Sequence, residues 1–558
     1  MSPTRILITL ALSFVITACS TDDSPDLVIF NGTLLTMDSE TQGATAFAVD
    51  DGLIIAVGSD EEILQLSTRS TEQIDLDGNT LLPGFNDAHL HALALPAGSV
   101  PIGDVRDRET LHAILRERAT QLEPDQWVVA HGYDDTNFGG HLTYHDLDAS
   151  GVGNPILLIH GSLHLYLING VALSNAGINN DTPDPAGGFY GRDAAGKLNG
   201  LVSERSALEP VFVDSQPAPY PIEFSSALTA LNSFMATALA NGITSYSDAM
   251  VPPELAYLYW WVDPEAYGVR VNLMFDEAKL DDAITLKQRD EALGEWGWNP
   301  FSNPWLRGRT VKLFHGMSLS GRTARLHEEY ADRPGYFGEA PQRNQAELDA
   351  FIRRVHDAGF QAATHSNGDY EIDMVLNAYE KVIDPSTDIE NPRHRIEHGS
   401  IASQSILERM SKLGVVYAPH SYMYEKGNML EAYGEARWPW LFPNAASLEH
   451  GIVNAANSDY PVSALSPLRR IQSLMNRTSR SGKTYGKSQV LSAEQALYAY
   501  TMGGAYASFE ENVKGSITAG KYADFVILAE DPRAVAIEKI HAIDILATYS
   551  AGIQRYRK

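Results

Sequence analysis

The sequence predicts an α/β chain built on a (β/α)8 barrel, joined to a small β-sandwich that both chain ends assemble. From about residue 222 onward, helical segments that end in glycine are followed by apolar strands, and such repeated units build a parallel sheet. The number of these units favours closure into a barrel. Short alternating strands occur near both ends of the 558 residues, which predicts the sandwich. A stretch of weak periodicity between the first barrel strand and the repeats predicts an insertion.

Residues 1–18 are expected to be a signal peptide and not part of the fold. Arg5 precedes an apolar run that is too short to span a membrane, and small residues follow it. Cys19, the only cysteine, stands at a junction typical of bacterial lipoproteins and is followed by Ser20. We therefore expect lipidation of Cys19 and a tether over residues 19–26. The product would be an exported bacterial lipoprotein facing the periplasm or on the outer-membrane surface. An ordinary signal peptide cut elsewhere is the alternative.

The domain boundaries follow from the same patterns. Short strands with Asn-Gly and Asp-Gly turns predict the N-terminal part of the sandwich over residues 27–83, and GSITAGKYADFVIL predicts the C-terminal part within residues 505–558. The barrel is expected over residues 84–504. Residues 92–222 are rich in Gly, Pro and Asp and interrupt the barrel after its first strand. We expect them to form an insertion subdomain that acts as a lid or binds substrate.

The composition excludes several classes of function. The chain has 42 Lys and Arg against 71 Asp and Glu, and its formal net charge of -29 repels nucleic-acid phosphates and anionic lipid headgroups. We therefore expect no nucleic-acid partner, and contact with a membrane only through the lipid anchor. One cysteine allows no internal disulfide and no Cys-based zinc site. Any metal ion must then be bound by histidines and carboxylates.

Polar residues at the ends of successive barrel strands converge on one site. Read in order, these ends give His89, His91, Lys312, His365, His398 and Asp459. Imidazole and carboxylate are ligands that zinc and similar divalent ions prefer. His89 and His91 lie two residues apart, so on a strand both side chains point inward. Two core histidines are the alternative for that pair alone, but the whole set predicts a metal centre. Glu397 would point away from this side of its strand and is interpreted as structural.

Lys312 needs a separate explanation because an ammonium group does not bind a metal ion. It lies in the β-branched, apolar strand RTVKLF, where an unpaired charge is costly. One explanation is an ion pair with a carboxylate such as Asp459 or Glu204, which would leave a mononuclear site. The other is carboxylation by carbon dioxide, which gives N6-carboxylysine, a carbamate that can bridge two metal ions.

The sequence resembles the amidohydrolase superfamily, and within it the YtcJ-like and N-substituted formamide deformylase-like group of amidohydrolase family 3. The resemblance covers about residues 26–535 and rests on the motifs LPGFNDAHLH, VKLF, THSNGD, RHRIEHG, NSDYPVS and GSITAGKYADFVIL. It implies two divalent metal ions, with zinc as the expected metal. The implied roles are His89 and His91 on one ion, carboxylated Lys312 as the bridge, His365 and His398 on the other ion, and Asp459 as ligand of the first ion and general base.

The resemblance also implies that insertion segments around His164 and Glu204 approach the substrate. His164 is a candidate catalytic donor to the oxyanion, and packing within the insertion is the alternative. The chain departs from the family pattern at His315, where a small residue is usual, and at His420, where Gln is commoner. We predict that the residues in contact with substrate include Glu204, His315, His420 and Trp438.

The ligand set predicts a metal-dependent hydrolase, and the resemblance implies that it cleaves a carbon–nitrogen bond other than a peptide bond, of the amide, N-formyl or N-acyl type, in a small molecule. A metal-bridging hydroxide would attack the carbonyl carbon, and Asp459 would pass its proton to the leaving nitrogen. A mononuclear deaminase is the alternative within the superfamily, but it needs a His-x-x-Glu-type acid where His365 is followed by Ser-Asn-Gly. A non-catalytic binding lipoprotein is a third interpretation, which would be expected to lack some ligands. The sequence leaves the oligomeric state open, a homodimer included.

Overall fold

The structure is a computed structural model that describes residues 24–93, 95–96, 98–185, 187–212, 224–293, 303–383 and 391–558. The expected signal peptide and the lipidation site Cys19 lie outside the described residues, so the export prediction stays a prediction. Within the described ranges, no helix combines the length and the apolar character that crossing a bilayer requires.

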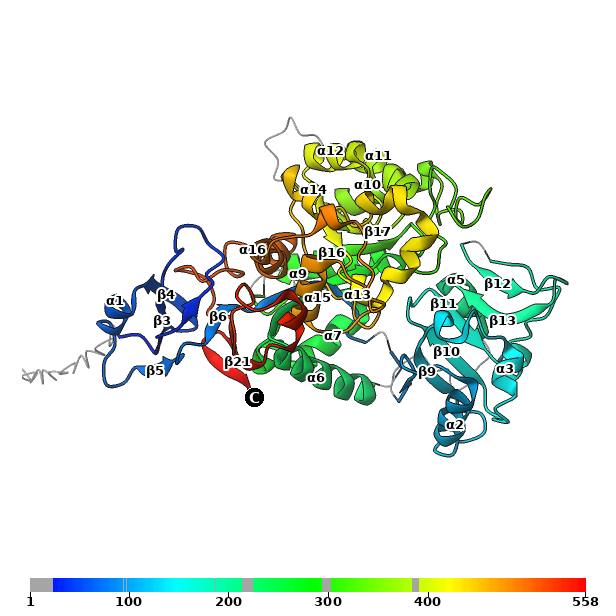
Figure 1. The fold of residues 1–558 in the computed structure, drawn as a ribbon, viewed down its shortest axis with the longest axis horizontal. Helices are drawn as coiled ribbons and strands as arrows, with labels where there is room; N and C mark the ends of the chain where they lie inside the picture. The colour runs from blue at the N-terminus through cyan, green and yellow to red at the C-terminus, as the bar shows by residue number, and fades with distance from the viewer. Residues whose placement is uncertain are drawn as a thin grey trace, which may run out of the picture.

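A parallel sheet forms the centre of the molecule (Figure 1). Its strand order is β19-β18-β17-β16-β15-β14-β7. Its strands are β7 (Phe85–Leu90), β14 (Ile243–Val251), β15 (Arg270–Asp276), β16 (Leu306–Phe314), β17 (Gln361–Ser366), β18 (Arg395–His398) and β19 (Val416–Pro419). Every neighbouring pair in this sheet is parallel. Polar residues at the carboxyl ends of these strands therefore meet at one end of the sheet.

The segment 453–459 joins the two edges of this sheet. On one side the backbone of Tyr417 exchanges hydrogen bonds of 3.1 and 2.8 Å with it, and on the other side the amide of Asp459 donates to the carbonyl of His89 at 2.9 Å. The segment thus takes the place of an eighth strand and closes the barrel. The α/β barrel architecture predicted from the sequence is confirmed in this form.

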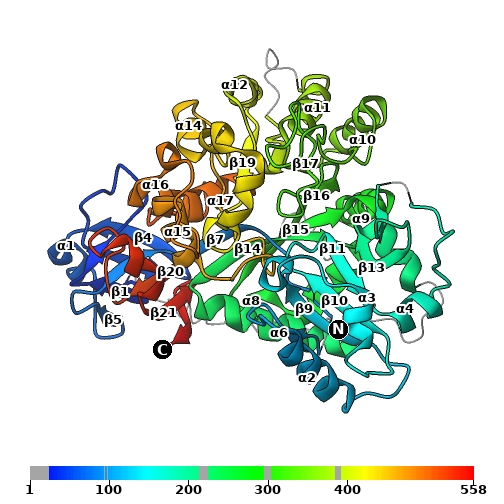
Figure 2. The same ribbon diagram turned by 45° about the vertical axis from the view of Figure 1, so that its right-hand side comes forward.

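Helices follow the strands and cover the outside of the barrel (Figure 2). The longer ones are α6 (Phe224–Ala240), α7 (Pro253–Val262), α9 (Leu280–Leu293), α10 (Gln345–Asp357), α11 (Asp369–Glu380), α12 (Gln404–Leu413) and α15 (Pro467–Asn476). Shorter ones are α8 (Pro264–Tyr267), α13 (Met423–Lys426), α14 (Asn444–Glu449), α16 (Ala493–Tyr498) and α17 (Gly504–Ala507). Local sequence fixes their ends: α10 begins with a capping box between Asn344 and Glu347, and α12 ends where Gly414 takes φ 62°.

Two small sheets from the chain ends pack face to face beside the barrel. One has the order β4-β3-β1-β5, from β1 (Leu27–Phe30), β3 (Ala46–Asp50), β4 (Leu53–Gly58) and β5 (Glu72–Asp75), with α1 (Asp60–Leu64) against it. The other has the order β2-β6-β20-β21-β22, from β2 (Thr33–Leu34), β6 (Thr80–Pro83), β20 (Phe525–Leu528), β21 (Ile545–Ser550) and β22 (Ile553–Arg557). Phe47 and Phe525 join the sheets edge to face at 5.4 Å. Helix α17 contacts β7 of the barrel, and the C-terminal strands begin at Phe525.

A six-stranded sheet of order β12-β13-β11-β10-β9-β8 lies between β7 and α6 in the sequence. It comprises β8 (Val100–Pro101), β9 (Val128–Tyr133), β10 (Ile156–His160), β11 (Leu165–Ile168), β12 (Phe189–Arg192) and β13 (Leu198–Ser203). Helices α2 (Arg108–Ala119), α3 (Tyr144–Asp148), α4 (Gly170–Asn175) and α5 (Arg205–Leu208) accompany it. Two ion pairs join it to loops at the carboxyl ends of the barrel strands: Asp135 with Arg322 at 3.3 Å and Arg205 with Asp276 at 3.1 Å. This sheet therefore lies over the end of the barrel at which the polar residues gather.

Candidate metal centre

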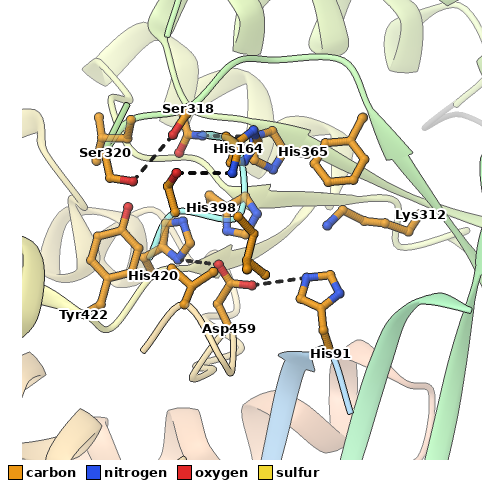
Figure 3. Close-up of a pocket in the computed structure, with 16 residues that line it drawn as sticks. His91, His164, Lys312, Ser318, Ser320, His365, His398, His420, Tyr422 and Asp459 are labelled. Carbon is orange, nitrogen blue, oxygen red and sulfur yellow. Dashed lines mark hydrogen bonds and ion pairs between the residues drawn. The ribbon is translucent and has the colours of Figure 1, made fainter. Parts of the chain in front are cut away.

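One pocket at the carboxyl ends of the barrel strands collects most of the predicted site residues (Figure 3). Its walls include His91, His164, Lys312, His365, His398, His420 and Asp459. The space not filled by atoms is about 490 Å³, part of it open to solvent. His89 is fully buried beside the pocket.

His89, His91 and Asp459 form a compact triad. The Nε2 atoms of His91 and His89 lie 3.4 and 3.7 Å from Oδ1 of Asp459. Nδ1 of His91 donates to the carbonyl of Ala249 at 3.1 Å, which leaves Nε2 as its ligating atom. Two donors that bind one tetrahedral zinc ion at about 2.0–2.1 Å are about 3.3–3.4 Å apart. The separations in the triad are close to that value and longer than ordinary hydrogen bonds, so this triad fits a divalent ion.

Glu397 orients His89, contrary to the prediction that it is only structural. Its Oε2 accepts from Nδ1 of His89, and both carboxylate oxygens accept from Arg395, at 2.6 and 2.9 Å. The prediction was wrong because it gave the inward side of the strand to His398. Glu397 pairs in register with the inward-facing His365, and His398 reaches the pocket because it leaves regular alternation with φ 73° at the end of β18. A carboxylate behind a histidine fixes the ring's tautomer and orientation.

Lys312 is fully buried on β16 and has no carboxylate oxygen within 4.0 Å in the part of the chain that the structure describes. Its Nζ lies 3.1 Å from Nε2 of His89 and 4.9 Å from the centre of the Phe314 ring. Burial lowers the pKa of Lys312 to about 8. The ion pair proposed as one explanation of this lysine is therefore not formed with Asp459 or Glu204. The lower pKa raises the fraction of Lys312 that is uncharged near neutral pH, and the uncharged amine is the form that carbon dioxide can carboxylate.

Three further imidazoles complete the floor and wall of the pocket. The rings of His365 and His398 are 4.4 Å apart, and those of His398 and His420 are stacked at 3.9 Å. Burial lowers the pKa of all three, that of His420 to about 3, so the rings are neutral and able to bind a cation. Among the described residues, Nδ1 of each ring and Oδ1 of Asp459 have no hydrogen-bond partner. Buried polar atoms without partners are rare, and a bound metal ion would satisfy them.

Asp459 is ionised in this setting. Burial alone would raise its pKa, but His91, His420 and Lys312 outweigh burial and hold the pKa of Asp459 below its ordinary value. Asp459 takes φ 51°, and Glu204 takes φ 69°. Left-handed backbone at residues other than glycine costs about 1–3 kcal/mol and tends to cluster at functional sites.

His164 lines the pocket from the insertion, and Glu204 lies behind it as its hydrogen-bond partner. Nδ1 of His164 donates to Oε2 of Glu204 at 2.8 Å, which leaves Nε2 of the ring available. Burial lowers the pKa of His164, but the carboxylate of Glu204 outweighs it and raises that pKa above its ordinary value. The ring of His164 lies 5.0 Å from that of His365. The predicted approach of these two segments to the barrel site is visible in the structure.

Three predicted substrate residues, Glu204, His315 and Trp438, are not among those that line the pocket, and Glu204 lies behind His164. His315 is fully buried, and both of its ring nitrogens lack a hydrogen-bond partner within the described ranges. Trp438 donates through Nε1 to the carbonyl of Leu430 and packs against the Tyr485 ring at 5.0 Å. Trp438 therefore stabilises the loop after β19, and the positions of His315 and Trp438 do not support contact with substrate.

Sequence reasoning missed Glu371, which organises the loop beside the pocket. Its carboxylate is fully buried and accepts the backbone amides of four residues: Met317, Arg325, Asn367 and Gly368. The loop after β16 and the turn after β17 are thereby held together. The only signal in the sequence was an acidic residue in the first turn of α11, which is common in ordinary helices.

Comparison with known proteins identifies the family. A model described as Amidohydrolase family (Amidohydro_3) matches residues 72–556. The chain belongs to the amidohydrolase family. This confirms the resemblance seen in the sequence and supports hydrolase activity that depends on a divalent metal ion.

Individual relatives align with nearly the whole length of this chain. A Bacillus subtilis (strain 168) protein named as the amidohydrolase YtcJ is 29% identical over 544 residues, which is 94% of this chain and 98% of that protein. An N-substituted formamide deformylase from Arthrobacter pascens is 28% identical over 553 residues, 96% of this chain and 98% of the enzyme. The crystal structure of an uncharacterized metal-dependent hydrolase from Pyrococcus horikoshii OT3 superposes with a TM-score of 0.71 at 23% identity, over 92% of this chain and 99% of that chain. That likeness shows a shared fold.

Proposed function

We propose that this amidohydrolase uses two divalent metal ions, with zinc as the expected metal, to hydrolyse an amide, N-formyl or N-acyl carbon–nitrogen bond in a small molecule. The observation that carries the proposal is the convergence of the His89–His91–Asp459 triad with Lys312, a buried amine with no carboxylate oxygen within 4.0 Å among the described residues. The name of the Arthrobacter relative supports the bond type, because a formamide is an N-formyl compound.

The donor set fits the ions by its chemistry. His89, His91 and Asp459 would hold the first ion, and His365 and His398 the second, with carboxylated Lys312 between them. Bound divalent ions supply a Lewis acid for the carbonyl oxygen and lower the pKa of water to near neutrality. The unpartnered nitrogens and oxygen in the pocket are the atoms that such ions would engage.

The chain's own residues supply the proton transfers. Asp459 is ionised and faces the pocket, so it can accept a proton from the attacking water and deliver it to the leaving nitrogen. His164 would donate a hydrogen bond from Nε2–H, as an imidazolium, to the carbonyl oxygen as negative charge develops there. Glu204 would hold the ring in that orientation from behind.

The test is hydrolysis of a panel of N-formyl and N-acyl amines by protein that has been stripped with a chelator and then reloaded. We expect activity to be lost on stripping, to return with zinc or another divalent ion, and to be absent in Asp459→Asn. His315→Ala, at a buried position outside the pocket, is the control and should retain activity if it folds. Activity that survives complete removal of metal, or that Asp459→Asn retains, would overturn the proposal.

We also propose that Cys19 carries a lipid that anchors the exported protein. The support is the sequence pattern around the single cysteine. Metabolic labelling with a fatty-acid analogue in a bacterial host should mark the wild-type protein and not Cys19→Ser. Equal labelling of both, or of neither, would reject the anchor without bearing on the hydrolase.

A further inference from the structure

We propose that His420 is a ligand of the second metal ion, together with His398, and that the carboxylate of Asp459 connects the two metal sites. This inference rests on the proposed function and adds a ligand to the set implied by the family pattern, in which this position is commonly Gln. It changes the assignment of His420 from a substrate contact to a part of the metal centre.

The two oxygens of Asp459 face different histidines. Oδ1 lies 3.4 Å from Nε2 of His91, and Oδ2 lies 3.5 Å from Nδ1 of His420 (Figure 3). Ligating atoms of His398, His420 and Asp459 lie within 4.8 Å of one another, as do those of the His89 triad. Asp459 is therefore the residue that the two triads share, with one oxygen toward each.

The contact between His420 and Asp459 does not have the geometry of a hydrogen bond. A nitrogen–oxygen hydrogen bond is normally about 2.7–3.2 Å, whereas donors that share one tetrahedral zinc ion are about 3.3–3.4 Å apart. The observed 3.5 Å falls beside the second value and equals the spacing in the first triad to within 0.2 Å. Nδ1 of His420 is buried and has no hydrogen-bond partner among the described residues. A simple His–Asp pair would leave that nitrogen unsatisfied, and a shared cation would satisfy it.

Packing holds the His420 ring in this position. The ring is stacked on that of His398 at 3.9 Å and lies 3.9 Å from that of Tyr422 at a tilt of 36°, so it packs against two aromatic neighbours. The backbone is fixed as well, because Nδ2 of Asn457 donates to the carbonyl of Pro419 at 2.9 Å. A ligand that is held before metal binds costs little ordering free energy when it binds.

The first experiment measures zinc per chain and zinc affinity in wild type, His420→Gln and His164→Gln. His164→Gln is the matched control, because it also removes an imidazole from this pocket, and the His164 ring already has Glu204 as a hydrogen-bond partner. We expect two ions in wild type and in His164→Gln. In His420→Gln we expect the weaker ion to be lost or to bind at least about 10-fold more weakly, while the tighter ion is retained.

A second variant distinguishes the loss of a metal ligand at position 420 from a general disturbance of the fold. Nδ1 is the ring nitrogen nearer to the backbone, so a thiolate at position 420 can reach the same ion. In a Cys19→Ser background, Co(II)-loaded His420→Cys should show a sulfur-to-cobalt charge-transfer band in the near-ultraviolet, and His164→Cys should not.

The outcomes separate the two proposals. Two ions of unchanged affinity in His420→Gln, or no charge-transfer band in a folded His420→Cys protein, would overturn the role of His420 and leave the binuclear hydrolase intact. The same loss of zinc in His164→Gln would also overturn it, because the effect would not be specific to position 420. Wild-type protein that binds no divalent ion would overturn both this inference and the proposed function.

Discussion

Replacing Glu397 with Gln tests how the first metal site is held. Glu397 contacts Nδ1 of His89 and forms two hydrogen bonds with Arg395, and all three side chains are fully buried. Gln keeps the size of the side chain but loses the charge. We therefore expect His89 to lose a charge-assisted partner and Arg395 to lose its only carboxylate among the described residues.

The substitution Glu397→Gln affects two quantities, the affinity for metal and the free energy of folding, and each has its own expected magnitude. Loss of a carboxylate behind a ligating histidine weakens metal affinity by about 10–100-fold, which corresponds to about 1.4–2.7 kcal/mol. Breaking a buried ion pair by removing one partner costs about 3–5 kcal/mol of folding free energy. Glu397→Gln should therefore lower both metal affinity and stability.

Asp524→Asn provides the matched control. Asp524 is paired with Arg270 at 2.7 and 3.2 Å, both are buried, and the pair lies where the barrel meets the sandwich, away from the pocket. Urea unfolding of the metal-free proteins should show a comparable loss of stability in both variants. Competition with a zinc-binding dye should show weaker zinc binding only in Glu397→Gln. Equal zinc affinity in the two variants would refute the role of Glu397 in orienting His89.

Two further predictions concern Lys312 and the His164–Glu204 pair. The pKa of Lys312 is about 8 in the folded protein against 10.5 in the unfolded chain, so the folded state binds fewer protons between these values. We therefore compare the free energy of unfolding of metal-free, carbonate-free wild type with that of Lys312→Met by urea unfolding. The difference should change in favour of wild type by up to about 3 kcal/mol between about pH 8 and about pH 10.5. A difference that does not depend on pH would contradict this. For the pair, His164→Phe should lower kcat by about 100- to 1,000-fold, and Glu204→Gln should lower it less, with little change in KM. A change confined to KM would instead assign both residues to substrate binding.

Much of the fold was predictable because its signals are local. The helix–glycine–strand repeats gave the barrel, and the two-residue spacing of His89 and His91 placed both rings on one side of β7. The position of Asp459 followed from the same repeats. These features depend on the alternation of a strand and on short-range turn chemistry, which a sequence displays directly.

The remaining features depend on contacts between distant segments. Glu397 meets His89 across 308 positions, and the inward direction of the neighbouring His398 depends on its left-handed backbone, which no local pattern reveals. Glu371 binds amides from two separate segments, the loop after β16 and the turn after β17. The strands of the insertion are short and interrupted by glycines in left-handed conformations, such as Gly132 and Gly200, which concealed a regular sheet. His315 and Trp438 were placed near the site by their position after barrel strands, but their side chains pack elsewhere.

The most direct test of the account is the metal content per chain of wild type and Lys312→Ala, each purified without chelator and incubated with zinc, with and without bicarbonate. We expect about two ions in the wild type with bicarbonate, and one or none in Lys312→Ala whether or not bicarbonate is present. About one ion in both proteins, independent of bicarbonate, would contradict the carbamate-bridged pair, and no ion in the reloaded wild type would contradict metal-dependent hydrolysis at this site.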